Sequence, residues 1–438
     1  MTSLRGLVDW ALGGDVLADV DQAVLVVTDT VAAIVGAAVE PEVAGFALAA
    51  PRLGGQGAAT VLATGARTSP YAASLANGQA AVRLELDEGN QFAANHPGAH
   101  TLPAVLAVAE ELDADGPAFL AACAAAYEVA VRVAAGTRLR RAVHPFGTTM
   151  ACGAAVGVAR LRGLDTDTTV RAVRIAAALT PASTQRAANS GATVRNAITG
   201  VSAASGVLAV ELATTGTTAD PRALHTVYGE VLGDAFDDSR LDDGLGELRY
   251  LTRNYVKLHA CSRWNHAPIE ALAALVAEHG VTAADVESVE VATYDPATRL
   301  DGTAPTSGFG GKHSIPYSIA VRLLLGHNGI AAYTDDVAAD PAVRDLMARV
   351  RVVEDPAMTR LAPAVRAARV TVRLRDGRAL TAQEDRAPGG FDRPYDRATL
   401  RAKHEELLGP ATADVLAWCE ALPRAGSVRG LDRLVARS

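Results

Sequence analysis

The sequence has few aromatic residues. Phe, Trp and Tyr make up 4% of its 438 residues, whereas hydrophobic residues together make up 49%. A core with so few large rings has to be built from Ala, Val and Leu, and such small side chains pack best where helices approach one another closely. The composition therefore favours an α-rich globular fold over a disordered chain. A chain of this length exceeds one ordinary hydrophobic core, so we expect two domains.

Lysine is also scarce. The basic residues are almost all Arg, and the only lysines are Lys257, Lys312 and Lys403. The formal net charge of −8 argues against nucleic-acid binding through a broad basic surface. A local cationic pocket is still compatible with that total. Codon bias explains why lysines are few but not where they stand, so each one is a candidate for a specific role.

The four cysteines lie far apart and form no CxxC pair, which argues against a zinc site and against a disulfide framework. Cys123 and Cys152 stand in Ala-rich runs and are expected to be buried. The chain also lacks a GxxxxGK[ST] phosphate loop, an HExxH helix and a GxSxG elbow. Its Gly-rich stretch at 54–57 does not stand between a strand and a helix, so a dinucleotide-binding fold is unsupported.

Signals for export are missing as well. The N-terminal residues contain no continuous apolar stretch of the signal-peptide kind. The apolar run at 30–39 is short for a membrane span and has acidic residues on its flanks. We therefore expect a cytoplasmic protein with no membrane contact.

The first part of the chain has a helical pattern. Apolar residues recur at helical spacing, and Gly, Pro, Asp and Thr separate the segments as stop and cap signals. The segments with this spacing are 21–39, 103–112, 117–135, 150–161, 166–178 and 202–214. Asp165 is a candidate N-cap for the fifth of them.

The character changes after about residue 254. Alternation predicts strands at 286–293, 350–354 and 368–374, and Asp376-Gly377 predicts a tight turn into a hairpin. Helical segments lie between them at 266–279 and 314–325. We predict a helical domain at 1–253, an α+β domain at 254–394, and C-terminal helices at 395–438 that return to the helical domain.

Two His-Pro turns stand out in the helical part. Glu85, Asp87 and Glu88 fall within four positions, and His96-Pro97 follows them. Pro fixes the backbone beside the imidazole and so aims the ring, although a surface loop explains the same pattern. The second turn, at His144, precedes a Gly/Ala-rich helix whose N–H groups favour anions, and an ordinary capped helix is an equal alternative.

Three further segments contain candidate residues. Arg195 stands where a loop enters a helix and is able to bind a carboxylate bidentately, although a solvated Arg is commoner. Lys257, Arg263 and His266 cluster at the predicted domain junction, where ligand sites are favoured, and here we favour function. Tyr317 follows Ser and Pro at a helix start and is a candidate proton donor or carboxylate ligand.

In order and spacing, these motifs together resemble the MmgE/PrpD family over essentially the whole chain. The motifs that carry the resemblance are Asn77-Gly78 with the acidic loop, His96-Pro97-Gly98, His144-Pro145 with Gly153-Ala154-Ala155, Leu161-Arg162-Gly163-Leu164-Asp165, Lys257 with Cys261, Arg263 and His266, and Ser314-Ile315-Pro316-Tyr317. The family activities include 2-methylcitrate dehydratase, cis-aconitate decarboxylase and iminodisuccinate epimerase. The resemblance implies a mainly α fold, with a large all-helical domain plus a smaller α+β lid domain, an active site between the two, and a homodimer.

The resemblance also implies site residues. The catalytic set it implies is His96, His144, Lys257 and Tyr317. The substrate-binding set it implies is Glu85, Arg195, Arg263 and His266. The chain departs from many relatives at three positions, with Val82 for His, Glu85 for Asp and Arg195 for Lys. The pattern around Lys257 is closer to the epimerase-like branch than to methylcitrate dehydratases.

The family reactions share one difficulty, which is negative charge on a carbon next to a carboxylate. A base moves the proton and cations hold the developing charge, so neither a metal nor an organic cofactor is needed. We expect a lyase that acts on a small anionic carboxylate, with dehydration as the first choice. Epimerisation and cis-aconitate-type decarboxylation are the enzymatic alternatives, and a carboxylate-binding protein on the same scaffold is the non-enzymatic one.

Overall fold

The computed structural model describes residues 3–435. The chain forms two compact units, and each is described by itself. The helical unit comprises Met1–Thr184, Val194–Tyr255 and Asp396–Ser438, and the α+β unit comprises Gln185–Thr193 and Val256–Tyr395. The sequence places Gln185–Thr193 in the helical domain, and this assignment differs from the structure. Asn189 explains the difference, because its side chain donates to the carbonyl of Arg299 in the α+β unit.

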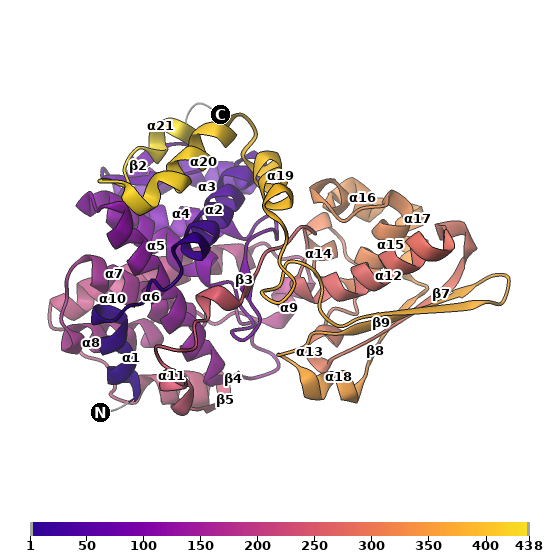
Figure 1. Cartoon of the computed structure of the whole chain (residues 1–438), viewed down its shortest axis with the longest axis horizontal. Coiled ribbons are helices and arrows are strands. Elements are labelled where there is room, and N and C mark those ends of the chain that lie inside the picture. The colour runs from indigo at the N-terminus through magenta and orange to yellow at the C-terminus, as the bar shows by residue number, and fades with distance from the viewer. Residues whose placement is uncertain (1–2, 436–438) are drawn as a thin grey trace. The chain divides into compact units, whose positions relative to one another are not determined.

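The helical unit contains most of the helices (Figure 1). In chain order they are α1 (Ser3–Gly13), α2 (Val20–Gly36), η1 (Ala37–Val39), α3 (Pro41–Gly54), α4 (Pro70–Ala81), α5 (Pro97–Leu112), α6 (Gly116–Ala135), α7 (Met150–Leu161), α8 (Thr166–Ala178), α10 (Val194–Thr214), η2 (His225–Val231), α11 (Ser239–Asp242), η3 (Leu251–Arg253), α19 (Arg397–Leu408), η7 (Gly409–Ala411), α20 (Thr412–Ala421), η8 (Leu422–Arg424) and α21 (Leu431–Val435). The last five follow residue 395 and belong to this unit, in which α19 and α20 pack against α2 (Figure 1).

Close helix crossings form the core of this unit, as the scarcity of aromatic residues suggests. Helix α10 packs against α4 and α7, and α6 packs against α7. A Cβ on Gly200 of α10 would lie 2.0 Å from the carbonyl oxygen of Leu75 in α4. A Cβ on Gly153 of α7 would lie 2.2 Å from the carbonyl oxygen of Ala126 in α6. Helices this close leave room only for Gly at these two crossing points.

Local signals explain the ends of these helices. Asp165 caps α8 through a hydrogen bond from the amide of Thr168, as predicted. Helix α5 begins at Pro97 and α10 at Val194, both earlier than predicted, and Pro103 lies inside α5. Pro97 fits the first turn because its missing N–H would have no partner there. The second His-Pro turn leads into α7, so both turns position an imidazole beside a helix start.

Three small antiparallel strand pairs also belong to this unit. They are β1 (Ala59–Val61) with β2 (Ala66–Thr68), β3 (Gly89–Asn90) with β6 (Asn254–Tyr255), and β4 (Thr137–Leu139) with β5 (Gly233–Phe236). The sequence predicts no strands in this region. Segments of two to four residues are too short to show an alternating pattern.

Three helical segments of this unit are long and apolar enough to cross a membrane by length and composition. They are Val20–Val39, Gly116–Ala135 and Val194–Thr214. The prediction that the first apolar run is too short was wrong, because it counted only 30–39 and the helical segment spans 20 residues. Between 61% and 78% of each apolar window is buried inside the protein. Packing in the core thus accounts for most of their apolar surface.

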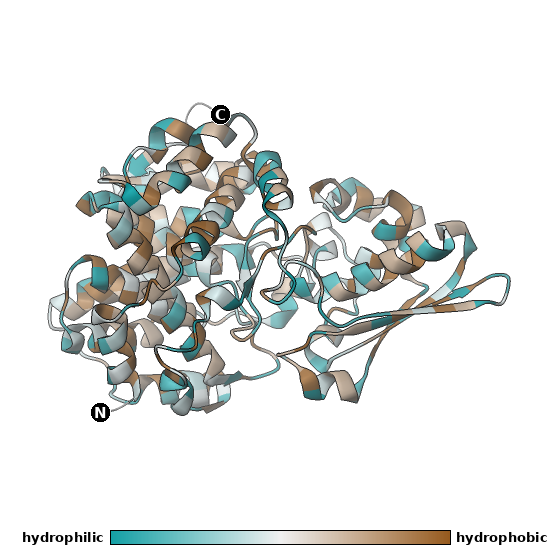
Figure 2. Ribbon diagram, viewed as in Figure 1, coloured by the Kyte–Doolittle hydropathy of each residue, from teal (hydrophilic) through white to brown (hydrophobic). Residues whose placement is uncertain are grey.

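The α+β unit is built around a mixed sheet with strand order β10-β9-β7-β8. Its strands are β7 (Val286–Thr293), β8 (Val350–Glu354), β9 (Ala368–Leu374) and β10 (Ala379–Glu384). Three predicted strands and the hairpin are confirmed, and Gly377 takes a left-handed φ of 91° in the turn. Hydrophobic and hydrophilic residues alternate along β9 of this hairpin (Figure 2).

Helices cover this sheet. Helix α12 (His266–His279) packs on β9 and β10, and α15 (Ile315–Leu325) packs on β8. The other helices of the unit are α9 (Gln185–Asn189), η4 (Arg263–Asn265), η5 (Ala283–Asp285), α13 (Asp295–Thr298), α14 (Gly308–Gly311), η6 (Ile330–Tyr333), α16 (Asp335–Ala339), α17 (Pro341–Met347) and α18 (Pro356–Leu361). The fold is therefore mainly α, with a smaller α+β part, as predicted.

Candidate active site

The acidic loop of the helical unit joins α4 to α5 through β3. Helix α4 ends at Ala81, and the loop then turns at Glu85, whose φ of 57° lies in the left-handed region. A residue with a Cβ adopts this conformation only at a cost of about 1 kcal/mol or more. Glu85 is fully buried, and its Oε1 lies 2.5 Å from Nη1 of Arg195. The turn therefore directs this carboxylate inward, onto a cation at the start of α10.

The loop also holds the ring of His96. Nδ1 of His96 lies 2.8 Å from the carbonyl oxygen of Glu88 and 2.7 Å from Oδ2 of Asp87. Both neighbours are acceptors, so Nδ1 carries the proton in the neutral ring. The lone pair of neutral His96 is then on Nε2. The arrangement gives a base whose orientation is set by a carboxylate and a backbone carbonyl.

Glu88 is the third carboxylate of the loop, and it is buried between backbone and Tyr127. Its Oε1 accepts from the amide of Gly98 at 2.6 Å, and its Oε2 accepts from the hydroxyl of Tyr127 at 2.9 Å. A Cβ on Gly98 would lie 2.6 Å from that Oε1, which explains the glycine after His96-Pro97. Burial raises the pKa of Glu88 to about 8, against these two hydrogen bonds, which lower it.

This shift predicts a pH effect on stability. The pKa of Glu88 is raised from 4.5 to about 8 on folding, so its contribution is fully present below about pH 4.5 and is lost as the pH rises through 8. We expect the midpoint of urea unfolding to change less with pH in Glu88→Gln than in the wild type between pH 5.5 and 8.5. Other buried carboxyls titrate in both proteins and cancel in the difference. Glu230→Gln, at an exposed carboxylate, is the matched control. A difference between wild type and Glu88→Gln that is the same at every pH would contradict the assignment.

The second His-Pro turn holds the His144 ring in the other tautomer. The amide of Phe146 donates to Nδ1 of His144 at 3.2 Å. Nδ1 of His144 is therefore an acceptor, and Nε2 carries the proton in the neutral ring. His144 and His96 are thus held in different tautomers, one with a basic Nε2 and the other with Nε2–H as a donor.

Phe146 lies at the centre of the cluster formed by these residues. Its ring centroid is 4.9 Å from that of His96, 5.1 Å from that of His100 and 4.8 Å from that of His144. The guanidinium carbon of Arg195 lies 3.6 Å from the same centroid, in a cation–π contact. Three imidazoles and one cation therefore surround a single aromatic ring. The structure brings together His96, His144, Arg195 and Glu85, which the sequence names as separate candidates.

His100 is a structural member of the cluster. Its Nδ1 donates to the carbonyl of His96 at 2.8 Å, and its Nε2 accepts from the amide of Gly147 at 3.2 Å. Burial lowers the pKa of His100 to about 3, so the ring stays neutral at neutral pH. With both nitrogens bound to backbone, it ties the two His-Pro turns to each other.

Arg195 retains hydrogen-bonding capacity. Besides Glu85, its Nη1 reaches Oδ1 of Asn196 at 3.2 Å. Its Nε is buried and makes no hydrogen bond within residues 3–435. A buried guanidinium donor of this kind is suited to an anionic oxygen.

The other four predicted residues lie in the α+β unit. Lys257 is completely buried near its start. Arg263 donates to the carbonyls of Pro388 and Ala387 at 2.8 and 2.7 Å, and its Nη1 lies 3.2 Å from Nδ1 of His266. Burial, followed by the positive charge of Arg263, lowers the pKa of His266. Arg263 therefore fastens the 387–388 loop to a neutral imidazole.

Tyr317 is held by backbone. Its hydroxyl donates to the carbonyl of Ala332 at 2.9 Å, the residue is fully buried, and burial raises its pKa. In this arrangement it packs against Tyr333, whose ring centroid is 5.4 Å away. Its role as a proton donor stays a prediction, and this geometry favours a supporting one.

A cavity of about 390 Å³ lies in the α+β unit beside the start of α15. Among its lining residues are Asn189, Ser190, Asp301, Thr303, Thr306, His313 and Ser314. None of the predicted site residues lines it, although Ser314 belongs to the motif that contains Tyr317. Within residues 3–435, no three His, Cys, Asp or Glu side chains are grouped as a metal site requires.

Two family models match the chain. Residues 15–236 match the MmgE/PrpD N-terminal domain, and residues 259–417 match the MmgE/PrpD C-terminal domain. The chain is 26% identical over 386 residues to a cis-aconitate decarboxylase of Aspergillus terreus, covering 81% of this chain and 78% of that protein. It is 40% identical over 107 residues to a 2-methylcitrate dehydratase of Cupriavidus necator, covering 23% and 22% of the two chains. The two domain matches cover most of the sequence, and the chain belongs to the MmgE/PrpD family.

Proposed function

We propose that the protein is a lyase that removes a proton from a carbon next to a carboxylate in a small polycarboxylate and eliminates a β-hydroxyl as water. The observation that carries the proposal is the pair of oppositely held imidazoles around Phe146. An elimination needs one group that accepts a proton and one that donates a proton. His96 and His144 meet these two needs.

The steps follow from the tautomers. Nε2 of His96 takes the proton from carbon, and Nδ1–H of the resulting imidazolium stays against Asp87 and the Glu88 carbonyl. The C–O bond to the β-hydroxyl then breaks, and Nε2–H of His144 gives its proton to the departing oxygen, so that water leaves. Arg195 binds a substrate carboxylate through the donors that Glu85 does not use. On the family resemblance alone, Lys257 is the further cation that we propose for the developing carbanion.

Decarboxylation is the second candidate, and the cis-aconitate decarboxylase of Aspergillus terreus, which matches 81% of the chain, favours it. In that reaction, loss of CO₂ creates the carbanion, and an imidazolium protonates it. Epimerisation remains the third candidate, because it requires the same base and reprotonation on the opposite face. These reactions share the site and differ in what leaves the substrate.

One experiment reads out all of these reactions. The protein is incubated in D₂O with a panel of polycarboxylic acids, including hydroxylated and unsaturated ones, and followed by ¹H and ¹³C NMR. The proposal predicts a new alkene signal from a β-hydroxy acid without release of CO₂. Release of CO₂ would support decarboxylation, and inversion of configuration would support epimerisation. Binding of an acid without any exchange or turnover would support a carboxylate-binding protein.

Two substitutions test the site assignment. We expect Lys257→Ala and His144→Ala each to abolish turnover while leaving thermal stability nearly unchanged, because their roles concern the substrate. Turnover is measured by NMR, and stability by thermal unfolding. His225→Ala, at a half-exposed imidazole paired with Asp238, is the control. Full activity in both variants would refute the assignment. The homodimer and the cytoplasmic location stay predictions from the sequence.

A further inference from the structure

The third lysine of the chain lies in a buried ionic cluster that the proposed reaction does not use. Nζ of Lys403, on α19, lies 2.5 Å from Oδ1 of Asp29 on α2 and 2.6 Å from the carbonyl oxygen of Leu86. Nε2 of His404 lies 3.2 Å from the same Oδ1. Lys403, Asp29 and His404 are all buried. Residues more than 300 positions apart in sequence thus meet at one peptide of the acidic loop.

Leu86 lies between two carboxylates of the candidate site. Glu85 precedes it and pairs with Arg195, whereas Asp87 follows it and lies 2.7 Å from Nδ1 of His96. The carbonyl of Leu86 lies in the peptide plane that carries the amide of Asp87. An ammonium bound to this carbonyl therefore fixes the orientation of the peptide that leads into Asp87.

The loop is an irregular segment whose shape depends on contacts with the elements around it. Glu85 has a left-handed φ, which its side chain disfavours, and no regular element covers 82–88. The backbone hydrogen bonds of this segment include turn bonds from the amide of Arg83 to the carbonyl of Ala80 at 3.1 Å and from the amide of Glu85 to the carbonyl of Val82 at 3.3 Å. The short contact from Lys403 fixes the same segment from the side of α19.

Stability alone is a weak reason for this cluster. Removing a lysine and an aspartate from water is costly, and apolar residues of similar size join helices as well or better. Burial raises the pKa of Asp29, but Lys403 and His404 outweigh it and lower the pKa overall. The carboxylate is thus kept charged as a partner for the ammonium. The ammonium in turn is the group that reaches the loop.

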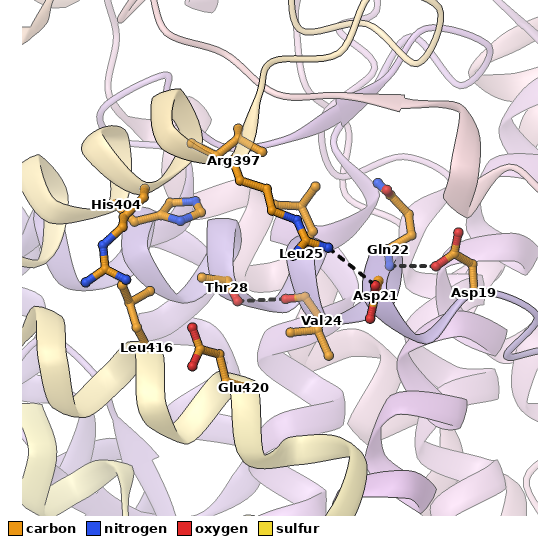
Figure 3. Close-up of a pocket in the computed structure, with 12 residues that line it drawn as sticks. Asp19, Asp21, Gln22, Val24, Leu25, Thr28, Arg397, His404, Leu416 and Glu420 are labelled. Atoms are coloured by element: carbon orange, nitrogen blue, oxygen red, sulfur yellow. Dashed lines mark hydrogen bonds and ion pairs between the residues drawn. The ribbon is translucent and has the colours of Figure 1, made fainter.

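His404 marks the outer side of the cluster. It lines a groove of about 600 Å³ between α2 and the C-terminal helices, beside Thr28 and Leu416 (Figure 3). The groove contains none of the predicted site residues. Lys403 does not line it, so the contact with Leu86 faces the interior of the unit.

We propose that Lys403 is a positioning residue, which holds Asp87 against His96 and Glu85 against Arg195 through the Leu86 carbonyl. The effect on catalysis rests on the proposed function, whereas the effect on His96 geometry does not. A misplacement of about 1 Å in a catalytic group reduces rates by roughly 10²-fold. Loss of Lys403 is expected to lower kcat on that scale through the Asp87–His96 contact, and a rise in KM would come from the Glu85–Arg195 pair.

The test uses Lys403→Met, Lys403→Arg and the double variant Asp29→Asn/Lys403→Met. The double variant leaves no unpaired buried charge, so it remains measurable where the single variant folds poorly. Arg401→Met is the matched control, because Arg401 stands on the same helix and is paired with Glu405 at the surface. Kinetics are measured on whichever acid is turned over, and ¹³C-labelled histidine side chains are observed by NMR in the free protein. His96→Gln assigns the His96 signal.

We expect the His96 signal to move in the folded double variant and to stay in place in Arg401→Met, with the His225 signal unchanged in both. Lys403→Arg should recover part of kcat, because a guanidinium still donates to the carbonyl. An unchanged His96 signal in the folded double variant would overturn the proposal, and so would an equal movement in Arg401→Met. These NMR outcomes are read without substrate, so failure of the proposed function is seen separately, as absent turnover by the wild type.

Discussion

His96→Gln should slow proton removal from the substrate carbon by about 10²- to 10⁴-fold, the range expected for loss of a positioned general base. The side-chain amide of Gln is able to donate to the Glu88 carbonyl as Nδ1 does, so the loop should keep its shape. It has no group that takes up a proton at neutral pH. The rate is measured as deuterium incorporation from D₂O, and folding is checked by thermal unfolding.

The control for His96 is His225→Gln. His225 also lies near a carboxylate, with Nε2 2.8 Å from Oδ2 of Asp238, but it is half-exposed and stands apart from the cluster around Phe146. The His225→Gln variant should incorporate deuterium into the substrate at the wild-type rate. Asp87→Asn should show a smaller loss than His96→Gln, because the Glu88 carbonyl still holds Nδ1–H. Wild-type exchange in His96→Gln would assign the base elsewhere.

Arg195→Met should abolish activity and lower the free energy of unfolding. The loss of stability is expected because Glu85 loses its partner. With Arg195 gone, a fully buried carboxylate is left without its cation. Breaking one side of a buried pair costs about 3–5 kcal/mol, whereas removing both charges is often nearly neutral. We therefore expect Glu85→Gln/Arg195→Met to regain much of the free energy of unfolding and none of the activity.

Urea unfolding and NMR turnover assays separate these two effects. Arg195→Lys should keep part of both, because the charge remains while the planar fork of donors is lost. Arg140→Met removes an exposed pair with Asp234 and should change stability little. If the double variant regained activity together with stability, Arg195 would be a purely structural residue and the substrate cation would have to be another group.

The sequence predicts the regular parts of this fold well, for physical reasons. Helices and strands leave periodic patterns, so α7, α8 and the β9–β10 hairpin appear where the pattern places them. The two His-Pro turns are also visible, because Pro restricts the backbone next to each imidazole. What the pattern lacks is any record of which segments meet.

The contacts that define the site join segments far apart in the sequence, so the pattern does not reveal them. Glu85 and Arg195 are 110 positions apart, and Lys403 reaches Leu86 across 317 positions. Phe146 is one of seven phenylalanines, and only the fold shows that three imidazoles surround it. The tautomers of His96 and His144 depend on backbone groups, which no residue type reveals. For Tyr317, the motif predicts a proton donor or carboxylate ligand, whereas in the structure its hydroxyl donates to the carbonyl of Ala332.

Deuterium incorporation at the substrate carbon next to the carboxylate tests the central claim most directly. The wild-type protein, incubated in D₂O with a polycarboxylic acid that it turns over, is predicted to place deuterium at that carbon during reversible exchange. His96→Gln is predicted to lose this incorporation while still binding the acid, as measured by calorimetry. A wild-type reaction taken to equilibrium, in which the recovered hydroxy acid carries no deuterium at that carbon, would contradict proton chemistry beside the carboxylate.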